Sequence, residues 1–218
     1  MNVPTLTPVE ARVLAVLIEK QRSVPDTYPM SVNALVSGCN QKTSRAPLMN
    51  VSDNDVLQAL DALKVLSLIV ETSGGRVMRY AQNVARVLAI PAQSVALLTV
   101  IMLRGPQTVG ELRIHSERLH RFADISSVEG FLAELAERSS GALVVELARQ
   151  PGARETRWAH LLSGAPAIPA ASEMSTASDE RVAVGELAAL RASVTQLASE
   201  VGELRATVDR VVRELGLK

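Results

Sequence analysis

The residues with the clearest capacity for binding chemistry lie between Asn40 and Arg45, where the sequence reads NQKTSR. Lys42 and Arg45 can donate hydrogen bonds to phosphate groups. The side-chain amides of Asn40 and Gln41 can form hydrogen bonds with base edges. The segment therefore predicts a surface that contacts a nucleic acid or a protein partner. The alternative is a solvated loop whose amides complete the hydrogen bonding of two helix ends.

Further basic and amide residues stand at positions expected to lie on a helix and on two hairpins. Asn54 and Gln58 belong to the helical segment after the loop, where they can read bases in a major groove. The hairpin arginines that can hold phosphates are Arg76, Arg79, Arg154 and Arg157. Because single arginines are also common on hairpins that bind nothing, both interpretations stay open.

Carboxylates occupy many of the positions at which a DNA-reading helix would present basic or amide groups. They are Asp53, Asp55 and Asp61 in the first half, and Glu129, Glu134 and Glu137 in the second. A carboxylate 4 Å from a phosphate costs roughly 1 kcal/mol in water and about 4 kcal/mol at an effective dielectric of 20. Acids in a first helical turn are otherwise explained by the helix dipole. The acidic positions therefore argue against tight DNA binding.

The overall charge points the same way. The chain has 218 residues, with 23 basic and 23 acidic side chains, whereas nucleic-acid-binding domains usually show a basic excess. The hydrophobic share of 47% supports real cores, which must be aliphatic because only 2% of the residues are aromatic. This balance argues against strong, nonspecific DNA affinity and favours a globular protein.

The sequence offers no arrangement of residues suited to catalysis or to a metal. His115 and His120 are five residues apart, which does not stack them on one helical face for zinc. Cys39 lies in an apolar segment without a neighbouring base, so it predicts a small buried side chain. We expect no enzyme activity, no cofactor and no metal site.

Several features predict a cytoplasmic protein. A single cysteine allows no internal disulfide and fits a reducing compartment. The opening MNVPTLTPVEARV lacks the charged start and apolar core of a signal peptide. The longest apolar stretch, near residues 95–103, is about half of the roughly 20 residues that a membrane span needs.

The elements that must position the binding residues follow a recognisable order. Thr7 and Glu10 form a capping box around Pro8 and start a first helix, and residues 31–41 predict a second, shorter one. Ser52 caps a third helix. Two extended runs around Ser73, Gly74 and Gly75 then indicate a hairpin. Three helices followed by a hairpin form the order of a winged helix-turn-helix.

The same order recurs from Pro91. Residues 91–105 predict a first helix, and Thr108 with Glu111 forms a capping box for the second. Ser126 with Glu129 is expected to cap the third, and two strands flank Pro151 and Gly152. We therefore predict a mainly α protein with small β-hairpins, built from two tandem winged helix-turn-helix domains at 1–90 and 91–162.

The remaining residues predict a linker and a coiled coil. Residues 163–180 are rich in Ala, Pro and Ser and should form a flexible linker. From 181 to 218, apolar residues recur in steps of four and three, as in a two-stranded parallel coil: Ala183, Leu187, Leu190, Val194, Leu197, Val201, Leu204, Val208, Val211 and Leu215. We expect a homodimer held by this seam, with a single amphipathic helix folded back on the domains as the alternative.

Several segments resemble the YceH-like family of uncharacterised bacterial proteins. They are LTPVEARVLAVLIEKQ, YPMSVNALVSGCNQKTSRAPLM and VLQALDAL, and the CNQK segment followed by an arginine is the family's hallmark. The resemblance covers roughly residues 6–162 and implies tandem winged helices, frequently with a C-terminal coil, but no established activity. The family usually has an acidic residue where Ala46 stands, so Arg45 is expected to be less tied to an acidic neighbour.

Together these features predict a dimeric tandem winged-helix protein of the transcription-regulator type. It would contact double-stranded DNA through the loop at 40–45 and through the wings. The alternative is an interaction adaptor that uses the same winged helices, including their acidic third helices, to bind an unidentified protein partner without binding DNA. The absence of net charge favours the adaptor, and the helical order favours the regulator.

Overall fold

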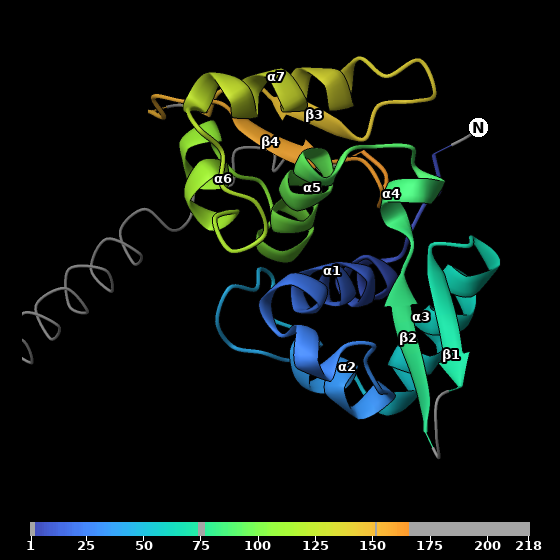
Figure 1. Cartoon of the computed structure of the whole chain (residues 1–218). Coiled ribbons are helices and arrows are strands. Elements are labelled where there is room, and N and C mark those ends of the chain that lie inside the picture. The colour runs from blue at the N-terminus through green and yellow to red at the C-terminus, as the bar shows by residue number, and fades with distance from the viewer. Residues whose placement is uncertain (1–2, 74–76, 151, 166–218) are drawn as a thin grey trace, which may run out of the picture. The chain divides into compact units, whose positions relative to one another are not determined.

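The computed structural model describes residues 3–73, 77–150 and 152–165 of the chain. These residues belong to one compact unit. The unit is mainly helical with two small antiparallel hairpins (Figure 1). The predicted coiled coil at 181–218 lies outside the described residues, as does the linker beyond Ala165.

The first half contains three principal helices, each capped by a side chain. Their bounds are α1 (Pro8–Ser23), α2 (Val32–Cys39) and α3 (Asp53–Val65), with a short 3-10 helix η1 (Pro25–Thr27) after α1. Thr7 and Glu10 form the predicted capping box of α1. Ser52 caps α3, as predicted, and its box partner is Asp55. Local capping chemistry therefore sets where these helices begin.

The first hairpin packs beside these helices. It consists of β1 (Ile69–Ser73) and β2 (Met78–Gln82), with Glu71 opposite Tyr80. Met30, just before α2, exchanges backbone hydrogen bonds of 3.0 and 2.8 Å with Tyr80. A short extended segment ahead of the second helix therefore pairs with the hairpin. The one-turn helix α4 (Val84–Val87) leads into the second half.

The second half repeats the pattern. Its elements are α5 (Ala92–Arg104), α6 (Val109–His115), α7 (Ile125–Ala136), β3 (Val144–Leu147) and β4 (Arg157–His160). Thr108 and Glu111 form the predicted capping box of α6. Gln107, just before α6, exchanges backbone hydrogen bonds of 3.1 and 2.7 Å with Trp158 on β4. The bridge between Met30 and Tyr80 thus has a counterpart in the second half.

The predicted cap of α7 is wrong. The helix begins at Ile125 and its N-cap is Asp124, whose carboxylate accepts a hydrogen bond of 2.7 Å from the Ser127 backbone. The Ser127 hydroxyl in turn accepts from the Asp124 backbone at 3.3 Å. Because this box closes two residues earlier, Ser126 and Glu129 lie within the helix and not at its start.

The core is aliphatic and runs between the two halves. Every residue from Ala11 to Ile18 of α1 is buried, because α2 and α3 cover one side of the helix while α5 covers another. Residues 94–103 of α5 are likewise buried without a break. A helix that is buried all round needs no polar face. The division of the chain at residue 90 stays a prediction, since both halves share this core.

None of the helices in the described ranges is both long enough and apolar enough to cross a membrane.

Candidate functional site

The loop that follows α2 is held in place by its own polar side chains. Asn40, the C-cap residue of α2, donates from its amide to the Val51 carbonyl at 2.9 Å and accepts from the Val51 backbone at 2.8 Å. Gln41 donates to the Thr43 hydroxyl at 3.0 Å and accepts from Lys20 at 3.3 Å. The amides of Asn40 and Gln41 therefore bond to groups within the protein, as expected for a loop that only connects two helices.

Arg45 is buried beneath the loop. Its side chain is 0% exposed and donates to the Glu19 carboxylate at 3.2 and 2.6 Å. It also donates to the Gly38 and Ser44 carbonyls at 3.1 and 2.9 Å. The expectation that Arg45 is free to contact a partner is therefore wrong for this structure, because α1 supplies an acidic partner in place of the one missing at Ala46.

A second arginine beneath the loop was not identified from the sequence. Arg12 on α1 is 1% exposed and donates to the Cys39 carbonyl at 3.3 Å and the Pro47 carbonyl at 2.8 Å. Burial lowers the pKa of Arg12, and the nearby charge of Arg45 lowers that pKa further. The sequence does indicate this burial, because Arg12 stands on the apolar face of α1 between Val9 and Val16.

Cys39 is fully buried, as predicted. Burial raises the pKa of its thiol to about 11, so the thiolate is scarce at neutral pH. This protonated state does not suit a nucleophile.

The other predicted contact residues are distributed over the surface. Lys42, Asn54, Gln58, Arg79 and Arg154 are exposed. Arg79 also donates to the Pro29 carbonyl at 2.8 Å, which fixes its direction. Arg76 lies outside the described residues.

Arg157 forms an ion pair within the second half. Its guanidinium donates to the Glu111 carboxylate at 3.1 and 3.4 Å and to the Pro106 carbonyl at 2.9 Å. Glu111 is also the capping-box residue of α6. The structure therefore joins Arg157 to the start of α6, and its charge is already partly balanced.

The acidic residues of α3 divide into two groups. Asp55 accepts hydrogen bonds from the Ser52 backbone and hydroxyl, and these bonds lower the pKa of its carboxyl. Asp53 and Asp61 stay exposed on the same helix, beside Asn54 and Gln58. The helix start explains Asp55, whereas Asp53 and Asp61 add negative charge to the candidate DNA-facing surface.

A polar cleft of about 470 Å³ lies beside the loop, between α1, α5 and α6. It is lined by side chains from both halves, and its charged or titratable members are Glu19, Lys20, Arg104, His115, Glu117 and Arg118. The Ala46 backbone donates to the Leu103 carbonyl at 2.8 Å and fixes the loop against α5. No pattern in the sequence indicated this cleft, because its residues come from four separate segments.

Arg104 is a half-buried cation of the cleft, as is Lys20. It donates to the Ser44 hydroxyl at 2.7 Å. Burial lowers the pKa of Arg104, and the charge of Arg45 lowers it further, while Glu19 has the opposite effect.

His115 adds an imidazole to the same wall. Its Nδ1 lies 2.7 Å from Gln107 Oε1, and the Gln107 amide nitrogen donates to the Pro106 carbonyl at 3.1 Å. Because a carbonyl oxygen only accepts, Nδ1 carries the hydrogen in this arrangement. Burial and the charge of Arg104 lower the pKa of His115. The described part of the chain contains no cluster of residues suited to a metal.

The fold and these surfaces define a mainly helical protein with two hairpins, and sequence comparison places it in a family. The chain belongs to the family described as "Protein of unknown function, DUF480", which matches residues 6–153. This agrees with the resemblance to an uncharacterised bacterial family that the CNQK segment indicated.

The chain is also similar to curated bacterial proteins along nearly its whole length. It is 58% identical to a UPF0502 protein of Burkholderia multivorans over 212 residues, covering 97% of this chain and 90% of the relative. It is 58% identical to a UPF0502 protein of Leptothrix cholodnii, covering 97% and 96% of the two chains. A UPF0502 protein of Dechloromonas aromatica is 55% identical, with 98% and 99% covered.

Proposed function

We propose that the chain is a tandem winged-helix protein of the transcription-regulator type that binds double-stranded DNA. The observation that carries this proposal is the repeated pairing of a residue before the second helix with an aromatic residue on the hairpin. In the first half Met30 pairs with Tyr80, and in the second Gln107 pairs with Trp158. In each half one bridge therefore adds a residue to a two-stranded hairpin beside three helices, at the place of the third strand of a winged helix.

Hydrogen bonds around the third helix repeat in the same way. The Leu68 backbone donates to Leu63, and Leu143 donates to Leu135, each joining the end of a third helix to the strand after it. Leu143 also accepts from Leu161, as Leu68 accepts from Asn83. Equivalent bonds at equivalent places support two copies of one domain.

The proposed DNA surface consists of exposed groups only. Asn54 and Gln58 lie on α3, the expected recognition helix, and Arg79 lies on the adjoining hairpin. Lys42 is the basic residue of the 40–45 loop that is exposed, because Arg45 is buried. Arg154 is exposed on the second hairpin, and α7 presents the carboxylate of Glu129 to solvent where a basic or amide group would be expected. The mixed charge predicts weak, salt-sensitive binding.

The complete protein, in this proposal, is a cytoplasmic homodimer without enzyme activity or a cofactor. The predicted coil at 181–218 would join two copies, and the linker would let the paired domains reach separated DNA sites. Linked sites bind with avidity when the linker spans them.

Binding of the full chain to a labelled duplex of mixed sequence, measured by fluorescence anisotropy across a salt series, tests the proposal. Phosphate neutralisation releases counterions, so affinity should fall steeply with salt. Joint replacement of Lys42, Arg79 and Arg154 by Ala should flatten the logarithmic slope by about one unit for each phosphate that is no longer neutralised. Arg86→Ala, at an exposed arginine on α4, is the matched control. No affinity at low salt would end the regulator proposal.

A protein adaptor is the second candidate, and the outer face of α3 favours it. Leu57 and Val65 are 43% and 85% exposed there, with the carboxylate of Asp61 between them. An apolar and acidic stripe suits a basic, amphipathic protein segment better than it suits phosphates. A stoichiometric partner that binds the wild-type chain but not Val65→Glu would support this candidate.

A further inference from the structure

We infer that the cleft between α1, the 41–44 segment, α5 and α6 binds a small organic anion that carries a phosphate or carboxylate group. The cleft shares no lining residue with the proposed DNA surface, although Lys42 belongs to the loop that borders both, and the inference does not rest on DNA binding. Its lining combines three cations with a smaller share of apolar side chains, and guanidinium and ammonium groups pair with phosphate and carboxylate.

The size of the cleft fits a small metabolite. Its volume of about 470 Å³ lies within the roughly 300 to 1,000 Å³ typical of small-molecule sites. Val100 and Leu103 close the cleft from the buried core, so the accessible apolar surface comes from Leu119 and from Ile114, which is 67% exposed. The ligand should therefore have an apolar body beside its charged group.

The charge of the cleft favours an anion. Lys20, Arg104 and Arg118 line it, against the carboxylates of Glu19 and Glu117. Arg45 lies outside the lining and neutralises Glu19 through their ion pair of 2.6 Å. Lys20 lies 3.5 Å from the same carboxylate. With Glu19 already paired to Arg45, cations outnumber anions in the cleft.

Arg104 is the group in the cleft whose charge is least compensated by its hydrogen-bond partner. It has lost part of its hydration, yet its hydrogen-bond acceptor is the neutral hydroxyl of Ser44 at 2.7 Å. Among the described residues, Arg104 forms no salt bridge. A phosphate or carboxylate accepts two parallel hydrogen bonds from a guanidinium and would compensate for that burial.

His115 offers a further donor when it is protonated. Its Nδ1 is committed to Gln107, so Nε2 is the nitrogen left for a ligand. Neutral imidazole would accept from a ligand hydroxyl, and the protonated ring would donate to an anion.

The position of the cleft gives its ligand a role in joining the two halves. Lys20 and the 41–44 segment belong to the first half, and Arg104, His115 and Arg118 belong to the second. A ligand that contacts both walls binds only when they are correctly placed. It therefore stabilises the folded unit by mass action, and this stabilisation grows with ligand concentration.

Thermal unfolding and isothermal titration of the full chain test the site, with inorganic phosphate and succinate as separate probes. Ionic strength is held constant with sodium chloride. We expect at least one probe to bind saturably and raise Tm, which also reports whether phosphate or carboxylate is preferred. Arg118→Ala and Arg104→Gln should each weaken binding about tenfold or more, while Gln retains a donor for Ser44.

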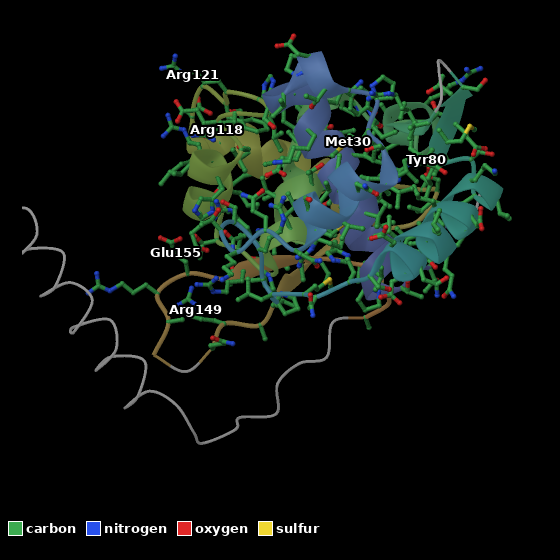
Figure 2. The ribbon with its side chains drawn as sticks, turned by 90° about the horizontal axis from the view of Figure 1, so that it is seen from below. Met30, Tyr80, Arg118, Arg121, Arg149 and Glu155 are labelled. Carbon is green, nitrogen blue, oxygen red and sulfur yellow. The ribbon has the colours of Figure 1, made fainter. Side chains whose placement is uncertain are left out.

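Arg121→Ala is the matched control. Arg118 and Arg121 both project from the segment between α6 and α7, but Arg121 does not line the cleft (Figure 2). Binding should be unchanged in this variant. The inference is overturned if neither probe binds saturably to the wild-type chain, or if all three variants bind alike. Because no DNA is present, failure here leaves the DNA-binding proposal untouched, and the converse also holds.

Discussion

Glu19 and Arg45, separated by 26 residues in the chain, form a two-pronged ion pair with nitrogen to oxygen distances of 3.2 and 2.6 Å. The pair connects the C-terminal half of α1 to the loop that leads to α3. It removes Arg45 from the surface and at the same time neutralises a carboxylate beside the cleft. This ion pair therefore sets the charge of both the 40–45 loop and the cleft.

Breaking this pair should destabilise the protein. Arg45→Met removes the two-pronged partner of Glu19, which then has Lys20 at 3.5 Å, and takes a donor from the Gly38 carbonyl. We expect a loss of about 2 to 3 kcal/mol in the free energy of unfolding. This is below the 3 to 5 kcal/mol typical of fully buried pairs, because Glu19 remains 18% exposed. Lys42→Met, at an exposed position of the same loop, should change stability little. Urea denaturation of both variants makes the measurement, and equal stabilities would contradict the assigned role of Arg45.

The sequence was informative wherever the determining contacts are local. Thr7 with Glu10, and Thr108 with Glu111, bond across a single helical turn, so their spacing alone indicates the cap. The cap at Asp124 was missed because its partner is the hydroxyl of Ser127, a residue that also suits other roles. Two capping-type residues within three positions left the local pattern ambiguous.

The burial of Arg45 could not be predicted from its neighbours. No acidic residue stands nearby in the sequence, because the carboxylate comes from α1, 26 residues earlier. The nearer acceptors are the backbone carbonyls of Gly38 and Ser44, which carry no sequence signal. The cleft was missed for the same reason. Its chemistry depends on how α5 and α6 meet α1, which is a property of tertiary packing and leaves no periodic signal.

Replacement by alanine should have opposite effects on stability at Gly38 and at Gly130. A Cβ atom at Gly38 would lie 2.6 Å from Val16 Cγ1. Val16 is a buried, β-branched side chain, so it has little freedom to move away. Gly38→Ala should therefore cost about 1 to 3 kcal/mol, as overpacking does. Gly130→Ala on α7 meets nothing within 4 Å and should stabilise the helix by about 0.5 to 1 kcal/mol. Chemical denaturation of both variants checks the pair, and a stabilised Gly38→Ala would show that the core accommodates the methyl group.

The free energy of unfolding should decrease as the pH is lowered, and His160 should contribute to that decrease. Its Nδ1 is buried without a hydrogen-bond partner among the described residues, and burial lowers the pKa of the ring below 6.5. The unfolded chain then takes up the proton first, so this contribution is complete above about pH 6.5 and is lost as the pH falls further. Each unit of lowering corresponds to about 1.4 kcal/mol.

His160→Phe isolates that contribution, because the aromatic ring is kept and the titration is removed. Its free energy of unfolding should change less between pH 7 and pH 5 than that of the wild-type chain. His115, whose pKa is also lowered, leaves a residual slope in the variant. Hydrogen bonds lower the pKa of the Asp55 and Asp124 carboxyls below the ordinary value of 3.8. Their contribution to stability is therefore lost only below about pH 3.8, outside the range of this comparison. Identical slopes for variant and wild type would exclude His160 as a contributor.

The predicted coil makes its own test possible. If Leu190, Leu197 and Leu204 lie in a parallel seam, replacing Leu197 by Glu should convert a dimer of the full chain into a monomer, because a charge at the seam is buried without a partner. Ser193→Glu, outside the expected seam, is the control. Light scattering gives the oligomeric state, and a wild-type monomer would count against the coil. Cysteines attached at the C-terminus should crosslink in a parallel dimer and would fail to do so in an antiparallel one.

The paired bridges give each half of the molecule its own optical signature. The chain has one tryptophan, Trp158 at the Gln107 bridge, and two tyrosines, Tyr28 and Tyr80, both in the first half. Tyr28 accepts a hydrogen bond of 2.6 Å from the Gln82 backbone, and Tyr80 lies at the Met30 bridge. Figure 2 shows Met30 and Tyr80 near one another. Tryptophan emission therefore follows the second half, tyrosine absorbance follows the first, and coincident melting by both signals would identify a single cooperative unit without any added label.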